Sequence, residues 1–452
     1  MNTLNWKLEG IPAYTDGELF DELFKLGGGL YDESLEATSL MHLINNTSSS
    51  AFLAYCGELE AAGFVGGFAR ETDAGIFREY IAEGKLVYTY YMKRVNQARV
   101  IYDNCSATYA EFSAEDASEA VRDDTELMQF GLFQGDPPIR DRVSTCGMLY
   151  VVRTHNNKLF LVDGGEDAQC TDEAFAELML RLRELTGTTD GETITIACWF
   201  CTHAHNDHMD LFINFMAKHR DVIKVERVLY NFPDVENLDI PPEHYERFIE
   251  HYWNDRMKRL RAYCKGARFM KAHTGQIFHF DNLTVDILDT QEDMIYEQTE
   301  NGAHLRGLNT TSTVMKLSFD GSTCLMLGDA DEVNGDVLVR YYSADELSCT
   351  YLQAAHHLAN RNENIYSYAK AETVLIPQSR LRTHKVRREH YGILCKYYDR
   401  DRFYLAADYT VIFRVKDGAE EVTYHQLQGG PFNPEKDSHN LARVVSAYEF
   451  ED

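Results

Sequence analysis

The sequence predicts an α/β fold with an additional α+β domain at its N-terminus, and three observations lead to this class. From about residue 144 onward, short apolar segments alternate with amphipathic segments of helical period, which is typical of layered helices and sheets. The first 125 residues have a different pattern, in which helical segments precede two strand-like segments. With 452 residues, the chain is long enough for roughly two or three domains and a full hydrophobic core.

Changes in composition divide the chain into four parts. A charged segment that ends in Gly and Pro residues separates the two folded parts and predicts a linker. The end of the chain, from QGGPFNPEKD onward, is typical of a loosely held tail. The predicted parts are an N-terminal α+β accessory domain at 1–125, a linker at 126–141, a main domain at 142–427 and a C-terminal tail at 428–452.

The N-terminal domain has no pattern that carries chemistry. Its periodicity predicts helices at 50–64 and 73–84 and strands at 85–93 and 98–104. It contains no His-x-His, no paired acids and no glycine-rich phosphate loop, and His42 is its one histidine. We therefore expect this domain to cover or flank an active-site cleft, or to form a dimer contact.

The main domain begins with a strand pair, predicted at 148–154 and 158–165. An amphipathic helix follows and ends at Gly187, since glycine favours the left-handed conformation of a helix C-cap. The apolar segment 193–202 predicts a buried strand, and 209–220 predicts the next helix. Further strands are predicted at 283–288, 312–319, 323–329, 350–357, 373–379 and 402–408.

The charge balance favours a small-molecule substrate over nucleic acid. The chain has 72 acidic and 44 basic residues, which gives a net charge of −28. Such a field repels polyanions, whereas affinity for nucleic acid depends largely on Lys and Arg contacts to phosphates. The segment 380–388, RLRTHKVRR, is the one basic patch that the sequence offers.

The sequence predicts a cytoplasmic protein. No segment approaches the ~20 apolar residues of a membrane span, and the first residues lack the features of a signal peptide. Ten cysteines occur without the spacing of a disulfide framework, which favours reduced thiols. Cys198 and Cys201 have the spacing of a redox motif but lie within a predicted strand, so we do not assign them redox chemistry.

The segment Cys201–Asp210, CTHAHNDHMD, follows a predicted buried strand and is rich in metal-ligating residues. His203, His205, Asp207 and His208 offer imidazole nitrogens and a hard carboxylate oxygen from one tight loop. One loop cannot saturate two metals, so further ligands must come from the ends of other strands. Candidates in that position are Asp329, His356, His357 and His384.

The order of the motifs KLFLVDGGE, THAHNDH, NTTSTVMKL, LMLGDAD, AAHH and THK resembles the metallo-β-lactamase superfamily. Within it, the motifs are similar to the soluble hydrolase domain of the competence protein ComEC family, and phosphorylcholine esterases are the second branch for comparison. The resemblance covers about residues 143–415 and implies an αββα sandwich with two divalent metals, Zn in preference to Mn or Fe. The ligands that it implies are His203, His205, Asp207, His208, Asp329, His356 and His384.

The resemblance also implies roles for residues around the metals. Asp163 braces the metal loop from behind the ligands. Asn309 and Ser312 match the Asn-x-x-Ser of the relatives and either cap a turn or hold substrate near the metals. Asp207 holds a metal and orients the nucleophile, and the leaving group takes its proton from the metal-bound water system or from His357.

The double histidine leaves a choice between two ligands. Adjacent residues at the end of a strand point to opposite faces, so one of the two reaches the metals directly. We prefer His356, which leaves His357 to face the substrate or to support the ligands. His273, in KAHTGQ, lies elsewhere in the order of motifs and is not expected to be a ligand.

These features predict a binuclear metal-dependent hydrolase, which uses a metal-bridging hydroxide on a small phosphodiester or a related ester. One alternative is a nuclease-type phosphodiesterase, which the ComEC resemblance favours and the net charge opposes. Another is a hydrolase of lactone or amide carbonyls. A non-enzymatic scaffold with a degraded metal site is disfavoured because all seven implied ligands are retained. A homodimer through the N-terminal domain is the expected protein contact.

Overall fold

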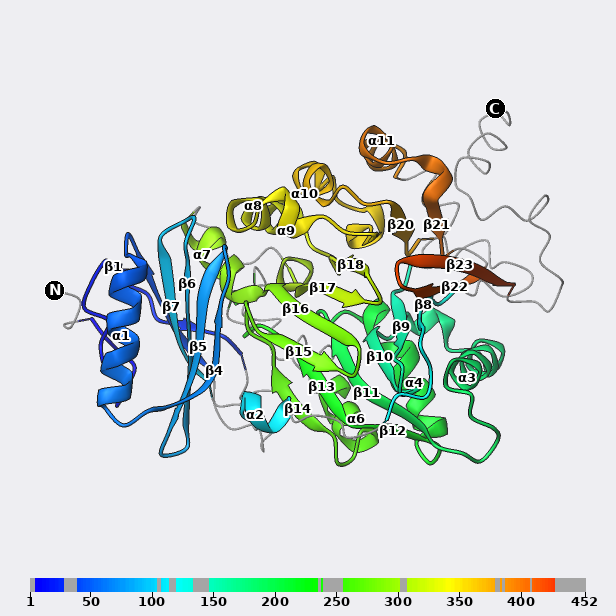
Figure 1. Cartoon of the computed structure of the whole chain (residues 1–452), viewed down its shortest axis with the longest axis horizontal. Coiled ribbons are helices and arrows are strands. Elements are labelled where there is room, and N and C mark those ends of the chain that lie inside the picture. Colours follow the sequence, from blue (N-terminus) through cyan, green and yellow to red (C-terminus); the bar gives the residue numbers. More distant parts are fainter. Residues whose placement is uncertain are drawn as a thin grey trace.

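The computed structural model describes most of the chain, in several stretches. Three β-sheets and their helices are arranged so that the N-terminal sheet lies beside a sandwich formed by the other two (Figure 1). None of the helices in these stretches is long and apolar enough to cross a membrane. The described residues are 5–27, 39–103, 107–113, 119–132, 146–234, 237–238, 255–300, 307–378, 383, 387–406 and 409–426.

The sandwich consists of a nine-stranded and a seven-stranded sheet. The first has the order β14 (Arg268–Lys271), β13 (Arg227–Tyr230), β11 (Ile194–Cys201), β10 (Leu159–Asp163), β9 (Leu149–Arg153), β8 (Thr125–Gln129), β22 (Tyr409–Lys416) and β23 (Ala419–Gln426), with β12 (Ile223–Val225) beside β11. The second has the order β15 (Ile277–Phe280), β16 (Leu283–Asp289), β17 (Val314–Phe319), β18 (Ser322–Met326), β19 (Tyr351–Gln353), β20 (Thr373–Ile376) and β21 (Phe403–Leu405).

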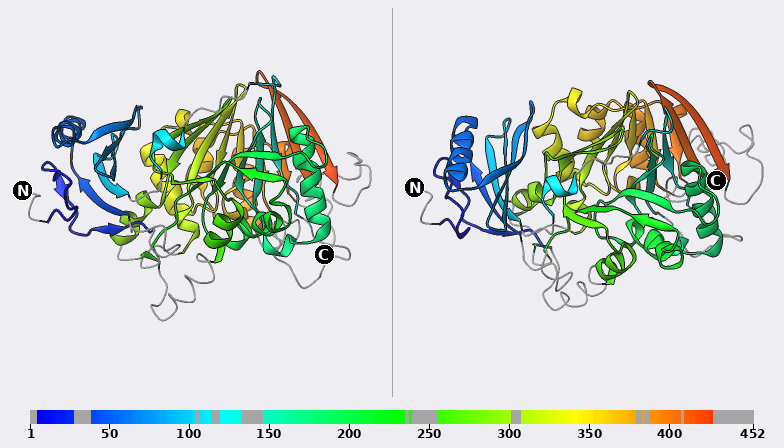
Figure 2. Two further views of the ribbon diagram at one scale, coloured as in Figure 1. Left: turned by 90° about the horizontal axis from the view of Figure 1, so that it is seen from below. Right: turned by 60° about the horizontal axis from the view of Figure 1, so that its bottom comes forward.

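Helices cover the outer faces of both sheets (Figures 1 and 2). On the first sheet lie α3 (Asp172–Thr186), α4 (Asp210–His219) and α6 (Asp255–Tyr263). On the second lie α8 (Glu332–Tyr341), α9 (Ala344–Leu347), α10 (Glu363–Ala369) and α11 (Arg388–Tyr397). The predicted fold class, an αββα sandwich with an extra N-terminal α+β unit, is confirmed.

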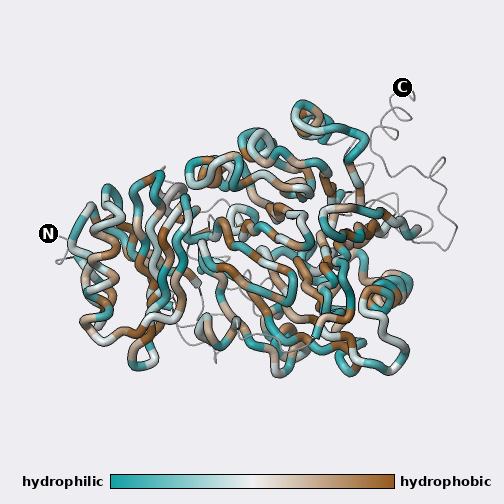
Figure 3. The backbone as a smooth tube through the Cα atoms, viewed as in Figure 1, coloured by the Kyte–Doolittle hydropathy of each residue, from teal (hydrophilic) through white to brown (hydrophobic). Residues whose placement is uncertain are grey.

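The strand β11 shows why the sandwich holds together. Phe200 points between the two sheets and packs in one core with residues such as Leu317 and Phe413. Trp199 points to the opposite face and contacts Phe212 of α4, with a centroid separation of 4.7 Å. Because both faces of the strand are buried, its sequence is continuously apolar rather than alternating. The tube coloured by hydropathy shows this concentration of apolar residues in the inner strands (Figure 3).

The N-terminal sheet is antiparallel and has two covered faces. Its order is β1 (Glu18–Leu19), β3 (Leu40–Asn45), β7 (Gln97–Asp103), β6 (Lys85–Met92), β5 (Gly75–Ala82) and β4 (Val65–Glu71), and β2 (Phe24–Lys25) pairs with β3. The helix α1 (Ser49–Ala61) covers one face. The other face shares a core with the sandwich, near α7 (Gln291–Glu300), and the short α2 (Tyr109–Phe112) contacts β4 and β14.

The helix predicted at 73–84 is wrong, because this segment forms β5. Ile76 and Tyr80 face α1, whereas Phe77 faces the sandwich. Burial on both faces removes the alternation of polar and apolar residues by which a strand is recognised. The helix predicted at 50–64 and the strands predicted at 85–93 and 98–104 are confirmed as α1, β6 and β7.

The linker predicted at 126–141 begins inside the sandwich. Residues 126–129 belong to β8, which pairs with β9 on one side and with β22 on the other. The short sequence TELMQ carries two charged or amide side chains, so it does not stand out as a strand in a charged segment. The rest of the linker from residue 133, and the tail predicted at 428–452, lie outside the described residues.

A buried ion pair network joins the N-terminal sheet to the sandwich. His273 lies between Glu292 and Asp103, with Nδ1 2.5 Å from Glu292 Oε1 and Nε2 3.1 Å from Asp103 Oδ2. Its ring stacks on Tyr88 of β6 at 4.7 Å. Burial lowers the pKa of His273, but Glu292 and Asp103 outweigh burial and raise this pKa to about 10. His273 is therefore a buried cation that holds the two parts of the protein together.

This raised pKa predicts a pH-dependent stability. A histidine with a folded-state pKa near 10 contributes stability that is complete below its ordinary value of 6.5 and is lost as the pH rises through 10. We expect His273→Gln to lower the free energy of unfolding near neutral pH. The free energy of unfolding of the wild type should decrease between about pH 6.5 and 10, and the variant should lose most of this decrease. Urea denaturation across this range measures the effect, with His279→Gln on the exposed face of β15 as a control. An unchanged pH profile in His273→Gln would contradict the assignment.

Candidate metal centre

The candidate site lies where strands of both sheets end. The loop that contains the short helix η3 (Asn206–His208) comes directly after β11 in the sequence, and the turn that contains Asp329 comes after β18. The segment η8 (Ala355–Leu358) follows β19, and η7 (Asn309–Thr311) precedes β17. The carboxyl ends of neighbouring strands are where layered α/β folds place their sites.

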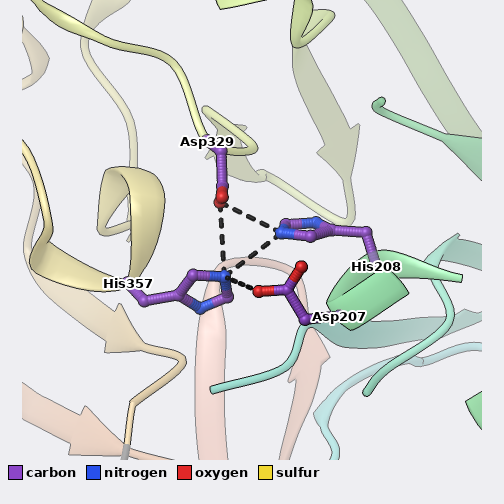
Figure 4. A group of neighbouring side chains, drawn as sticks. All are labelled: Asp207, His208, Asp329 and His357. Atoms are coloured by element: carbon purple, nitrogen blue, oxygen red, sulfur yellow. Dashed lines mark hydrogen bonds and ion pairs between the residues drawn. The ribbon is translucent and has the colours of Figure 1, made fainter. Parts of the chain in front are cut away.

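One group of potential ligands contains Asp207, His208, Asp329 and His357, whose ligand atoms all lie within 4.8 Å of one another (Figure 4). His208 Nε2 lies 3.1 Å from both Asp329 Oδ1 and His357 Nε2. His357 Nε2 lies 3.4 Å from Asp207 Oδ2 and 3.4 Å from Asp329 Oδ1. Two imidazoles and two carboxylates that converge in this way can hold one divalent cation.

A second group contains His203, His205 and Asp329. His203 Nε2 lies 3.0 Å from His205 Nδ1 and 3.8 Å from Asp329 Oδ2. Asp329 thus presents Oδ1 to the first group and Oδ2 to the second. A carboxylate shared in this manner can bridge two metal ions.

The far sides of the imidazoles are held by hydrogen bonds. His208 Nδ1 lies 2.7 Å from Asp163 Oδ2, and Asp163 also accepts hydrogen bonds from the backbone and hydroxyl of Thr202, both at 2.8 Å. His357 Nδ1 donates to the Pro377 carbonyl at 2.7 Å, which leaves Nε2 as the free acceptor. Such contacts behind the ligands are typical of metal sites because they set the tautomer and the orientation of each ring.

The electrostatics of the site keep two of its histidines and two of its carboxylates in the forms that bind metals. Burial lowers the pKa of His203 and of His205, which keeps both imidazoles neutral. Burial alone would raise the pKa of Asp207 and Asp329, but the neighbouring histidines, above all His208, hold the pKa of both carboxyls below the usual range. Neutral imidazoles and ionised carboxylates are the ligand forms.

His208 differs from the other histidines. Burial lowers its pKa, but Asp329 and Asp163 outweigh burial and raise the pKa well above the ordinary value. The protonated ring supplies positive charge between two buried carboxylates. A divalent cation at this position would supply the same compensation.

The geometry favours His357 over His356, which the sequence prediction preferred. His356 belongs to neither group of ligand atoms, its Nε2 is 3.6 Å from Asp329 Oδ2, and its side chain is 24% exposed. His357 is almost fully buried among the other ligands. The two residues do not continue a strand, so the alternation of faces that underlay the prediction does not apply.

The backbone of this segment is strained. His356, His357 and Leu358 have φ values of 47°, 48° and 60°, in the left-handed region. This conformation costs about 1–2 kcal/mol per residue for side chains other than glycine. Strain of this kind persists where the surroundings impose it and clusters at functional sites. Both histidines of this segment lie near Asp329, His356 Nε2 at 3.6 Å from Oδ2 and His357 Nε2 at 3.4 Å from Oδ1.

The other residues that the sequence analysis considered for the site differ in their distance from the ligands. Asn309 Nδ2 lies 2.9 Å from His356 Nε2, beside the ligands. Ser312 Oγ accepts a hydrogen bond from the Asp329 backbone at 3.0 Å and lies 3.2 Å from His203 Nδ1, so it supports two ligands. His384 lies outside the described residues. His273 is in the interface with the N-terminal sheet.

Two residues near the ligands were not predicted from the sequence. Cys146 Sγ lies 3.3 Å from Asp207 Oδ2, and Cys146 forms an isolated bridge with Gln378. Asn334, at the start of α8, connects the turn of Asp329 to the Asn309 loop. Cys146 reaches the site from a segment that is distant in sequence. Asn334 is close to Asp329 in sequence, in the capping box that begins at Asp331, but its contact with Thr310 depends on the folded structure.

Fold and site together define an αββα sandwich protein with a candidate metal centre at one edge. No model of a known protein family matches the chain, and no curated protein sequence matches it. Among solved structures, the chain is similar to the metallo-β-lactamase fold protein YhfI from Bacillus subtilis, at 11% identity and a TM-score of 0.35, over 67% of this chain and 100% of YhfI. The diiron β-hydroxylase CmlA from Streptomyces venezuelae matches at 12% identity and a TM-score of 0.30, over 72% of this chain and 69% of CmlA.

A metallo-β-lactamase from Cronobacter sakazakii with an HARLDQ motif matches at 13% identity and a TM-score of 0.26, over 65% of this chain and 86% of that protein. At these low values, the site rests on the geometry of this chain's own residues.

Proposed function

We propose that this protein is a binuclear metal-dependent hydrolase of the metallo-β-lactamase superfamily. The observation that carries this proposal is the position of Asp329, whose two oxygens face two separate groups of ligands. One metal would be held by His203, His205 and Asp329, and the other by Asp207, His208, His357 and Asp329. Zn, Mn and Fe all suit this set of nitrogen and oxygen ligands, and Zn is our first choice.

Divalent metals bound here would lower the pKa of a water molecule and polarise the scissile group of the substrate. The protein's own residues orient the reactants. Asp207, less buried than Asp329, lies on the open side of its group, where it can orient the nucleophile. This role needs no separate serine or cysteine.

His356 is the better proton donor to the leaving group, in place of His357. Both nitrogens of His357 face fixed partners, Pro377 O and the carboxylates. The His356 side chain is 24% exposed, and its Nδ1, although buried, has no hydrogen-bond partner within the described parts of the chain. Asn309 holds the other nitrogen and sets the ring orientation. Together, Asn309 and His356 form the side of the site that would meet the substrate.

The substrate we propose is a small phosphodiester or a related ester. The net charge of −28 disfavours a polyanionic substrate and so argues against a nuclease. A sub-micromolar Kd for DNA at ~150 mM salt would reverse this choice. Carbonyl substrates such as lactones and amides are the second candidate, since the same ligand set can polarise a carbonyl oxygen.

The proposal predicts about two transition metals per chain, because the site offers two groups of ligands around one carboxylate. Elemental analysis of protein prepared without chelator measures this content. A panel of chromogenic phosphodiester, phosphomonoester, lactone and β-lactam substrates then identifies the reaction. A metal content near zero that does not change on supplementation with Zn, Mn or Fe would refute the proposal.

A further inference from the structure

A buried polar network connects the candidate metal centre to the N-terminal sheet, and its central residue is Asn334. The Asn334 side chain is fully buried in the first turn of α8. Its Oδ1 accepts a hydrogen bond from the Asp331 backbone at 3.0 Å. Its Nδ2 donates to the Thr310 carbonyl at 3.2 Å and to Asp289 Oδ2 at 3.1 Å. One amide thus joins three segments that are distant in sequence.

Two of these segments carry residues of the site. Asp331 follows two residues after Asp329, and Thr310 directly follows Asn309. The two segments also contact each other, since Thr310 Oγ1 donates to Asp331 Oδ2 at 2.8 Å. Asn334 therefore sets the spacing between the shared carboxylate and the Asn309–His356 pair.

The third segment leads to the N-terminal sheet. Asp289 and Asp293 lie together without exposure to solvent, and the proximity of Asp293 adds to the effect of burial in raising the pKa of Asp289. Arg99 of β7 lies 3.4 Å from Asp293 Oδ1 and donates to Tyr341 Oη at 2.9 Å. Tyr341 itself donates to Asp293 at 3.1 Å.

Arg99 is the cationic end of this network and is fully buried. Burial of a charge without a partner is costly, so Arg99 and the carboxylates require each other. Any shift of the N-terminal sheet would move Asp293 and, through Asp289 and Asn334, the two loops of the site. A network of fully buried polar groups transmits such shifts because it has few alternative arrangements.

We propose that Asn334 is a positioning residue of the metal centre and that Arg99 is its counterpart in the N-terminal sheet. Through the contacts of Asn334, the N-terminal sheet fixes the distance between Asp329 and the substrate-facing pair Asn309–His356. This inference rests on the proposed function, since it assigns a role in metal and substrate binding. It explains how an N-terminal domain without chemical motifs of its own contributes to the site.

The test uses the full-length chain and Asn334→Ala, with Asp336→Ala on the exposed side of the same helix as a control. Asn334→Ala is expected to weaken Co²⁺ binding about 10-fold in competition with a chelator, equivalent to about 1.4 kcal/mol. KM for the substrate found in the panel is expected to rise by about 10-fold, with kcat within about threefold. Asp336→Ala is expected to match the wild type in all three quantities.

Two further variants test the path to the N-terminal sheet. The isosteric change Asp289→Asn keeps the shape of the Asp289–Asn334 contact, so it replaces Asn334→Ala in the test if that variant does not fold. Asp289→Asn is also expected to weaken Co²⁺ binding and to raise KM. In a double-mutant cycle, Arg99→Met and Asn334→Ala are expected to be non-additive in Co²⁺ affinity. Folded Asn334→Ala or Asp289→Asn with wild-type Co²⁺ affinity and KM, or full additivity with Arg99→Met, would overturn the inference. Absence of metal from the wild type would instead refute the proposed function.

Discussion

Replacement of Asp207 with Asn is expected to lower turnover by about 10² or more and to leave the fold intact. The change keeps the size of the side chain but removes the negative charge that lies 3.4 Å from His357 Nε2. Since Asp207 is 17% exposed and is not part of a hydrophobic core cluster, no core contact is lost. The effect therefore falls on the metal site and on the orientation of the nucleophile.

His205→Ala is expected to lower turnover to a similar extent, since it removes one of three ligands in its group. Steady-state kinetics of both variants, with elemental analysis and circular dichroism, separate a loss of metal from a loss of fold. Asp167→Asn, an exposed carboxylate change in the same domain, is the matched control. Wild-type turnover in Asp207→Asn or His205→Ala would show that the site has been assigned incorrectly.

A fragment that begins at residue 136 is expected not to fold. It lacks β8, which lies between β9 and β22 and pairs with both. Leu127 and Met128 of this strand are fully buried, and loss of one such side chain costs about 2–5 kcal/mol. The fragment also exposes the face that carries His273 and Asp293. The loss of both side chains, about 4–10 kcal/mol, is comparable to the 5–15 kcal/mol by which domains are typically stable.

Circular dichroism and thermal denaturation of the fragment test this expectation. A second fragment that begins at residue 119 keeps β8 and lacks the N-terminal sheet, so it separates the two contributions. We expect the second fragment to retain more structure than the first, with a lower Tm than the intact chain. A cooperative unfolding transition and full metal content in the fragment from residue 136 would disprove the role of β8 and of the interface.

The fold could be predicted well in the main domain and less well in the N-terminal part. The strand β11 and the helix α3 have clear local signals, namely a continuous apolar run and an amphipathic helix that ends at Gly187 in a left-handed conformation. The strand β5 has no such signal, because Arg78 and Glu79 interrupt its apolar residues. The strand β8 lies in a charged segment and is stabilised by partners that are distant in sequence, β22 above all.

The amino-acid sequence by itself determined the candidate metal loop. His203, His205, Asp207 and His208 lie within six residues after an apolar strand, so any fold that places this loop at a sheet edge brings the four side chains together. It also determined that Asp329 would follow the end of a buried strand. These features depend on spacing over a few residues, and the local backbone conformation sets the relative positions of residues that are so close in the sequence.

The tertiary structure decided the rest of the site. The choice of His357 over His356 depends on a segment with three successive left-handed residues, which the sequence does not reveal. The contacts of Asn334 with Asp289 and Thr310, and of His273 with Asp103, join segments separated by 24 to 170 residues. Interactions over such separations leave no periodic trace in the chain, because each partner satisfies its buried polar groups only after the sheets have assembled.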